Sequence, residues 1–284
     1  MCPTLWRRDE TSPVTSNAID RWIDRINRRI ARIHRRCVPT TTTTTPTLRL
    51  RYFNIEGPAE KSRLALRLGK IPFEDARVSF DDWRRGDLKA TTPYGQLPVL
   101  EITDDGRTTR TMAQSDAILR YCGRLATRAG VGLYDDARAE AIDEALALAE
   151  EMWSTWYVCL LVGMDPRKIG HCVEENAETF KGSATHEEVT KRMRERWMRE
   201  EYPRYAGFIE ARVAGGKYLC GDAVSIADCA LVPLLRRFAS GQLDHVPKDA
   251  VSSRKELQAY YDRFHALPEV RAWYAEREAA KAAA

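Results

Sequence analysis

Residues 48–69, which read LRLRYFNIEGPAEKSRLALRLG, decide the fold that we predict for this chain. Leu48–Asn54 is a short run rich in apolar and aromatic residues, as expected of a β-strand. Gly57 and Pro58 break the run, and the apolar residues at 64, 65 and 68 then recur at the spacing of one helical face. Gly69 is placed to end that helix. The stretch therefore predicts a strand, a turn and a helix.

The residues that follow predict more strands. Phe73–Phe80 and Leu97–Ile102 have strand patterns and are separated by a polar loop that carries Trp83. The Asp-Asp-Gly turn at 104–106 leads into a hairpin strand, and a helix is predicted to begin at Ser115. The order of elements is strand, helix, strand, loop, strand, hairpin strand and helix.

This order of elements predicts a thioredoxin-like α/β domain over residues 48–126. From Ala137 onward the patterns are almost all helical, which predicts an all-α domain over residues 134–284. A chain of 284 residues is long enough for two such domains.

Residues 1–47 differ from the rest and are predicted to form a basic amphipathic extension with a Thr/Pro linker. They hold nine Arg against four acidic residues, a net charge of +5, whereas the whole chain carries only +4. Isoleucines and Trp22 recur at helical spacing between 19 and 33, and arginines flank them up to residue 36. Three interpretations remain open for residues 19–36: a loosely packed surface helix, docking to a membrane surface or a protein partner, and an organelle-targeting segment.

Composition and charge exclude several classes of protein. The hydrophobic fraction of 44% is that of a globular chain, and no uninterrupted apolar run approaches the length of a membrane-spanning helix. The body after residue 47 carries a net charge of about −1, so no nucleic-acid partner is expected. The seven Cys form neither a C-x-x-C pair nor a metal-type spacing, which predicts no metal site and a reducing, cytoplasmic compartment. Cys122, Cys159 and Cys229 are predicted core residues.

Five motifs occur in one order along the chain: YFNIEGPAE at 52–60, Trp83 with Lys89, GQLP at 95–98, QSDAI at 114–118 and GDAVSIAD at 221–228. In this order they resemble the motifs of cytosolic glutathione S-transferases, with a sigma-like class the nearest. The resemblance covers nearly all of residues 48–280. It implies the glutathione transferase fold, glutathione as co-substrate and a homodimer.

The resemblance implies a glutathione site made of residues from the first domain. Gln114 and Ser115 would hold the γ-glutamyl end at the start of a helix, where free amides and the helix dipole favour a carboxylate. Leu97 before a cis Pro98, with Gln96 beside them, would pair with the cysteinyl part as a β-strand does. Lys89 and Trp83 would contact the glycyl carboxylate.

Tyr52 is the predicted catalytic residue, because glutathione attacks as a thiolate and a tyrosine hydroxyl can donate a hydrogen bond to it. The chain departs from sigma-like sequences at two neighbouring positions. Glu56 and Pro58 stand where arginines are common, and both changes are expected to disfavour the thiolate. Ser225 and Asp228 are predicted to form a capping box with a structural role.

The resemblance also implies a second substrate, a hydrophobic electrophile, between the two domains. Met152, Trp153 and Trp156 lie on the first long helix of the second domain and are predicted either to line that pocket or to form a core stripe. The predicted enzyme is a glutathione transferase, with isomerase or peroxidase side activity left open. The alternative is a non-catalytic subunit of the same fold that docks through its basic N-terminal helix.

Overall fold

The computed structural model describes residues 46–104, 106, 109–166 and 183–282. The predicted basic helix at 19–36 and all of the linker except residues 46 and 47 lie outside these ranges. Thr47 is already the first residue of β1. The prediction for the N-terminal extension therefore stays a prediction.

A four-stranded mixed sheet forms the first part of the fold. The strands are β1 (Thr47–Phe53), β2 (Glu74–Val78), β3 (Val99–Thr103) and β4 (Thr109–Ala113), in the order β2-β1-β3-β4. β1 is parallel to β2 and antiparallel to β3, and β3 and β4 form a hairpin. All four predicted strands are confirmed, within two residues at most of their boundaries.

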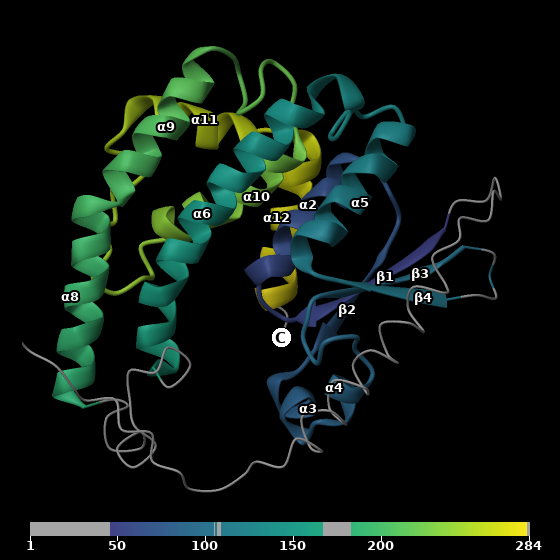
Figure 1. Ribbon diagram of the computed structural model, residues 1–284, viewed down its shortest axis with the longest axis horizontal. Coiled ribbons are helices and arrows are strands. Elements are labelled where there is room, and N and C mark those ends of the chain that lie inside the picture. Colours follow the sequence, from purple (N-terminus) through teal and green to yellow (C-terminus); the bar gives the residue numbers. More distant parts are fainter. Residues whose placement is uncertain (1–45, 105, 107–108, 167–182, 283–284) are drawn as a thin grey trace, which may run out of the picture.

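Two helices cover the sheet on the side that faces the rest of the molecule. They are α2 (Glu60–Leu68), which follows the short helical turn η1 (Gly57–Ala59), and α5 (Ser115–Arg128). α2 packs against α5, and Figure 1 shows both helices between the sheet and the C-terminal helices. Gly69 ends α2, as predicted. The thioredoxin-like arrangement expected from the order of elements is therefore confirmed.

The prediction of a polar loop around Trp83 was wrong about the local structure. The segment contains two short helices, α3 (Phe80–Arg85) and α4 (Asp87–Ala90). Ser79 caps α3 by accepting a hydrogen bond from the Asp82 amide, and Gly86 separates the helices with a left-handed φ of 94°. The charged side chains of this segment stay on its surface, which made it resemble a loop in sequence.

Helices make up the second part of the fold, as predicted. In chain order they are η2 (Asp136–Arg138), α6 (Ala139–Met164), α8 (Ala184–Glu200), α9 (Tyr202–Ala214), α10 (Ile226–Ala239), α11 (Lys255–His265) and α12 (Pro268–Ala282). α10 lies at the centre and packs against both α6 and α2, while α12 also packs against α2.

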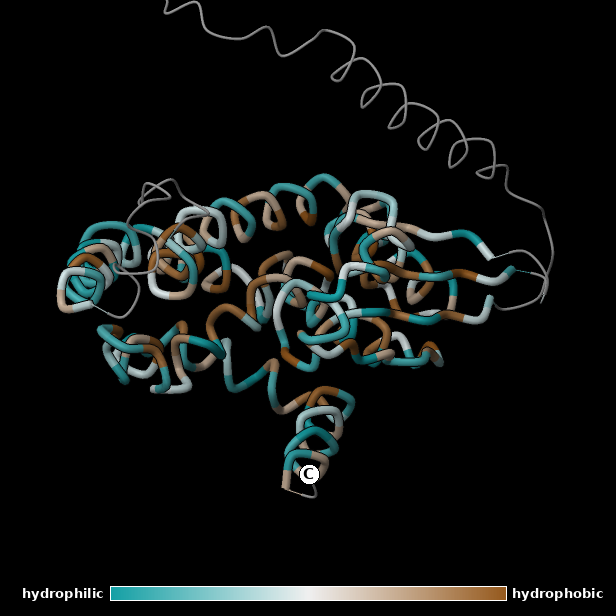
Figure 2. The backbone as a smooth tube through the Cα atoms, turned by 90° about the horizontal axis from the view of Figure 1, so that it is seen from below, coloured by the Kyte–Doolittle hydropathy of each residue, from teal (hydrophilic) through white to brown (hydrophobic). Residues whose placement is uncertain are grey.

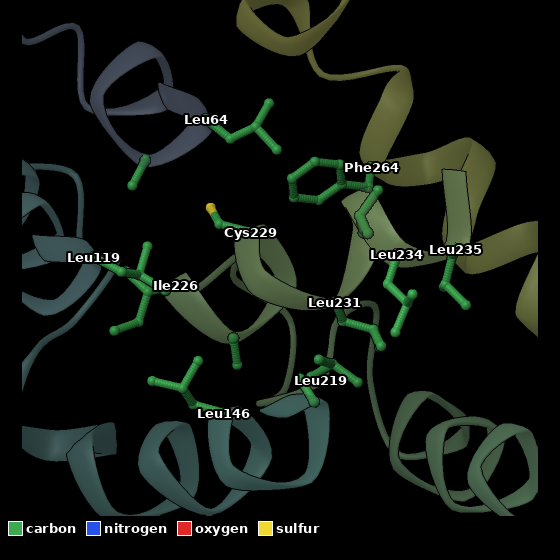
Figure 3. Close-up of a cluster of buried hydrophobic side chains, with 14 of the residues drawn as sticks. Leu64, Leu119, Leu146, Leu219, Ile226, Cys229, Leu231, Leu234, Leu235 and Phe264 are labelled. Atoms are coloured by element: carbon green, nitrogen blue, oxygen red, sulfur yellow. The ribbon is translucent and has the colours of Figure 1, made fainter. Parts of the chain in front are cut away.

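The core is continuous between the two parts because α10 contributes side chains to both. Figure 3 shows Leu64 of α2 and Leu119 of α5 on one side of α10, with Leu146 of α6 on another. Asp228 in the first turn of α10 accepts hydrogen bonds from the Ser225 amide at 2.8 Å and from the Tyr260 hydroxyl at 2.9 Å. The predicted capping box is present.

Hydropathy along the chain follows this burial. Figure 2 shows hydrophobic and hydrophilic stretches alternating along the helices, as amphipathic helices with one buried face require. α6 with the residues before it is long and apolar enough to cross a membrane, but half of its most apolar window is buried inside the protein. Cys122, Cys159 and Cys229 are buried and unpaired, which confirms them as core residues.

Candidate functional site

A cleft lies between the two parts of the fold, where the turn after β1 faces α6 and α10. Its walls are formed by residues of η1, of the first turns of α2 and α5, and of the facing sides of α6 and α10. The lining residues are Glu56, Gly57, Pro58, Lys61, Ser115, Ala149, Glu150, Trp153, Ala230, Pro233, Leu234 and Arg237.

Tyr52 of β1 lies directly behind this turn. Its side chain is 6% exposed, and its hydroxyl points at Gly57. A Cβ atom on Gly57 would lie 2.5 Å from the Tyr52 hydroxyl oxygen, and the φ of Gly57 is +47°. Only glycine allows this approach, because any other side chain would collide with the ring and strain the backbone.

The environment of Tyr52 keeps its hydroxyl protonated. Burial raises the pKa of Tyr52 to about 12, although the positive charges of Arg63 and Arg237 act in the opposite direction. A phenol with this pKa is neutral at physiological pH. It can therefore donate a hydrogen bond to an anion, but it is a poor base.

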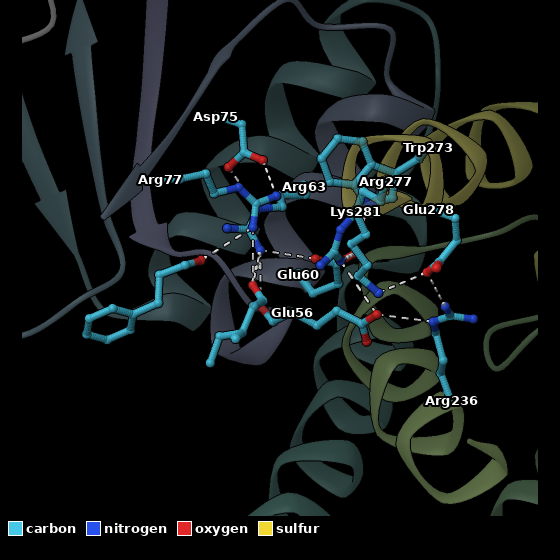
Figure 4. Close-up of polar contacts among 12 residues, drawn as sticks. Glu56, Glu60, Arg63, Asp75, Arg77, Arg236, Trp273, Arg277, Glu278 and Lys281 are labelled. Atoms are coloured by element: carbon cyan, nitrogen blue, oxygen red, sulfur yellow. Dashed lines mark hydrogen bonds and ion pairs between the residues drawn. The ribbon is translucent and has the colours of Figure 1, made fainter. Parts of the chain in front are cut away.

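A network of charged side chains fixes the turn that carries Gly57. Arg63 is fully buried, and one of its amino groups donates to the carbonyls of Ile55 at 2.9 Å and of Glu56 at 3.1 Å. The carboxylates of Asp75 and Glu60 pair with Arg63 at 2.9 and 3.1 Å. The turn is therefore held from behind by an arginine on α2 (Figure 4).

The same network connects the turn to the C-terminal helices. Glu60 is fully buried and accepts hydrogen bonds from the Trp273 indole at 2.7 Å and from Arg277 at 3.1 Å, both on α12. Glu56 pairs with Arg236 of α10 at 3.2 Å and with Arg277 at 3.5 Å. The negative charge that Glu56 was expected to add beside the site is therefore compensated (Figure 4).

Pro58 occupies the first turn of η1, where its missing amide hydrogen would have no partner in any case. It brings no charge to the cleft wall.

The structure brings Trp83 and Lys89 together across the break between α3 and α4. The Lys89 ammonium lies 5.8 Å from the centroid of the Trp83 ring. Trp83 in turn packs edge-on against Phe53, with ring centroids 5.8 Å apart, so that it is anchored to β1 next to Tyr52. Lys89 is exposed to solvent.

Leu97 and Pro98 lie immediately before β3, and the peptide bond between them is cis, as predicted. Pro98 is buried, whereas Leu97 is half-buried and Gln96 is exposed. Because β3 begins only at Val99, the backbone of Leu97 lies outside the sheet pairing.

Gln114 and Ser115 lie at the N-terminus of α5. Gln114 precedes the helix with a φ of 73° and a ψ of 113°, a strained conformation for a residue with a side chain. Ser115 is the first helical residue, and no side chain caps the helix at Gln114. The helix therefore begins at Ser115, as predicted, and its N-cap position is Gln114. Ser115 lies on the wall of the cleft.

Of the three residues predicted to line a hydrophobic pocket, only Trp153 lies on the cleft. Met152 and Trp156 are 0% exposed. The Trp156 ring packs against Trp197 and Phe238, each at a centroid distance of 5.0 Å. Met152 and Trp156 are therefore core residues, which was the other role predicted for them, and their assignment to the pocket was wrong.

Two models of known protein families match the chain. The family model described as "Glutathione S-transferase, N-terminal domain" matches residues 58–125, and the one described as "Glutathione S-transferase, C-terminal domain" matches residues 176–277. The chain belongs to the glutathione S-transferase family. The matches fall on the sheet part and the helical part respectively.

Relatives in this glutathione S-transferase family are matched over nearly their whole length. Glutathione S-transferase 1 of Ascaris suum is 29% identical over 82% of this chain and 97% of its own. Hematopoietic prostaglandin D synthase of Mus musculus is 25% identical over 83% of this chain and 99% of its own. The solved structure of prostaglandin synthase D of Nilaparvata lugens superposes with a TM-score of 0.61 at 27% identity, covering 81% and 98% of the two chains.

Sequence reasoning missed the arginines of α10. Arg236 and Arg237 lie side by side in the sequence, but Arg236 faces Glu56, whereas Arg237 lines the cleft. The helical spacing of the apolar residues 231, 234, 235 and 238 would have indicated that this pair borders the buried face of a helix. It would not have shown which surface they meet.

Proposed function

We propose that this glutathione S-transferase binds glutathione along the edge of its sheet part and activates the thiol with Tyr52. Lys89 and Trp83 would hold the glycyl end, Gln96, Leu97 and Pro98 the cysteinyl part, and Gln114 and Ser115 the γ-glutamyl end. The observation that carries the proposal is the Tyr52 hydroxyl, which lies against Gly57 at the border of the cleft. A thiol bound there would meet a neutral hydrogen-bond donor.

The energy needed is within reach of this arrangement. Lowering the pKa of a thiol by about two units requires roughly 3 kcal/mol of preferential stabilisation of the thiolate. A hydrogen bond to a charged acceptor contributes about 1.5–3 kcal/mol. Tyr52, with a pKa raised to about 12, stays a donor throughout the pH range in which the thiol ionises. The proton of the thiol passes to solvent.

The second substrate would lie in the cleft against Trp153, Pro233 and Leu234. The thiolate sulfur would attack an electrophilic carbon and form a C–S bond, while a leaving group departs with its electron pair or the adduct takes a proton from water. A hydrophobic electrophile suits these walls, and conjugation of such compounds is a detoxification reaction. Isomerase or peroxidase side activity would use the same thiolate.

A sigma-like homodimer in the cytoplasm is the assembly and location that we infer. Tyr94 supports a dimer, because it is an aromatic side chain left 52% exposed on the sheet part. Light scattering on the full chain would then give twice the monomer mass of 32.4 kDa. The monomer mass would contradict the dimer. Docking of residues 19–36 to a membrane surface or a protein stays a separate prediction.

Glutathione binding and conjugation to an aryl halide test the proposed function. In the Tyr52→Phe variant, glutathione should still bind, because the tripeptide is held mainly by other residues, whereas conjugation at pH 6.5 should fall by roughly 10- to 100-fold. Tyr94→Phe is the matched control and should conjugate like the wild type. No glutathione binding by the folded wild type would refute the transferase function. Unchanged conjugation in Tyr52→Phe would remove Tyr52 from the mechanism.

A further inference from the structure

The cleft contains a cation whose charge no acidic side chain in the described part of the chain meets by an ion pair. This is Arg237 of α10, a half-buried residue whose guanidinium carbon lies 6.0 Å from the centroid of the Trp153 ring. Its neighbour Arg236 has partners, since it pairs with Glu56 at 3.2 Å and lies over the Tyr274 ring at 4.1 Å. Consecutive helical residues point about 100° apart, which separates the two roles.

The other charged residues of the cleft are already balanced. Glu56 pairs with arginines of α10 and α12. Lys61 pairs with Asp116 and lies 3.5 Å from the carboxylate of Glu150. The turn itself, residues 56–59, contains no basic side chain. Arg237 therefore provides the positive charge on this wall that remains available to a bound anion.

The charge of Arg237 reaches the Tyr52 hydroxyl. It lowers the pKa of Tyr52 against the effect of burial, as the charge of Arg63 does. Arg63, however, is fully buried behind the turn and pairs with Glu60 and Asp75, so that its charge is compensated. Arg237 instead lines the cleft, where a ligand would lie.

We propose that Arg237 stabilises the glutathione thiolate from the helical part of the fold, opposite the hydrogen bond from Tyr52. This inference rests on the proposed function. The Trp153 ring beside the guanidinium helps to hold it in the cleft through a cation–π contact. An opposite charge within about 4–6 Å of an ionisable group shifts its pKa by about 1–3 units toward the charged form. Removal of the charge therefore raises the pKa of the bound thiol.

The test is a pH titration of bound glutathione in the full-length protein, followed by the ultraviolet absorbance of the thiolate. Arg237→Gln should raise the pKa of the bound thiol by about one unit or more. Arg237→Met is a second neutral variant that keeps the aliphatic stem, and Arg237→Lys, which keeps the charge, should stay close to the wild type. Arg271→Gln removes one positive charge from an exposed position on α12 and is the matched control.

The outcomes separate this inference from the proposed function. A low thiol pKa in the wild type, with both neutral variants at the same value as Arg271→Gln, would overturn the role of Arg237 and leave Tyr52 in place. An equal rise in the control and in the neutral variants would also overturn it, because the effect would then be one of net charge. If the wild type binds no glutathione or leaves its thiol pKa unchanged, the proposed function fails, and this inference fails with it.

Discussion

Replacement of Gly57 by alanine tests whether the turn after β1 positions Tyr52. The added Cβ atom would lie 2.5 Å from the Tyr52 hydroxyl oxygen and 2.7 Å from Cε1 of its ring. Either the backbone at residue 57 or the Tyr52 side chain must move, because contacts this short do not occur. The left-handed φ of +47° adds a backbone cost of roughly 1–2 kcal/mol for a residue with a side chain.

The functional loss follows from the hydrogen bond that the displaced hydroxyl would no longer make. A hydrogen bond to a thiolate contributes about 1.5–3 kcal/mol, so that kcat/KM for conjugation to an aryl halide should fall by roughly 10- to 100-fold. Urea denaturation should show a loss of stability of at least about 1 kcal/mol. Steady-state kinetics at saturating glutathione measure the loss of activity, and urea denaturation measures the loss of stability.

Gly130→Ala provides the matched control. Gly130 also has a left-handed φ, +89°, but nothing lies within 4 Å of the position of an added Cβ atom. This variant should lose a similar amount of stability from the backbone and keep its kcat/KM. If Gly57→Ala retains kcat/KM within about twofold of the wild type, the placement of the Tyr52 hydroxyl does not depend on this turn and the reasoning is refuted.

Three further predictions concern buried side chains. Glu60→Gln should lower the free energy of unfolding by about 3–5 kcal/mol, because it removes the buried carboxylate that pairs with both Arg63 and Arg277 and leaves Arg63 with Asp75 alone. A loss below about 1 kcal/mol in urea denaturation would contradict the network. Trp156→Ala should cost about 3–5 kcal/mol by the same assay but leave KM for the electrophile unchanged, since Trp156 is a core residue; a raised KM would return it to the pocket. Burial lowers the pKa of His265. As pH falls below about 6.5, His265 therefore takes up a proton in the unfolded chain before it does so in the folded protein. The wild type should lose stability there by up to about 1.4 kcal/mol per pH unit relative to His265→Phe. Parallel pH profiles of stability for the two proteins would refute this.

The sheet part could be predicted from local sequence because its signals are local. The alternation around Tyr52, the break at Gly57 and the hairpin turn at 104–106 each act over a few residues. Motifs such as these also carried the resemblance to the family. The short helices α3 and α4 escaped prediction, since charged surface residues at helical spacing leave no apolar stripe.

The contacts across the cleft could not be predicted, because they join residues far apart in the sequence. Glu56 was interpreted as an uncompensated charge, but its partners lie on α10 and α12. The periodicity of α6 showed that Met152 and Trp156 belong to an apolar stripe, but not which element that stripe meets. Trp153, one residue away, turns toward the cleft instead.

The most direct test of the central claim is a crystal structure of the protein with glutathione bound. The account predicts the glutathione sulfur within hydrogen-bonding distance of the Tyr52 hydroxyl, with the γ-glutamyl carboxylate at the first amides of α5. A tripeptide bound elsewhere, or one at this site whose sulfur has another partner and lies away from Tyr52, would contradict it.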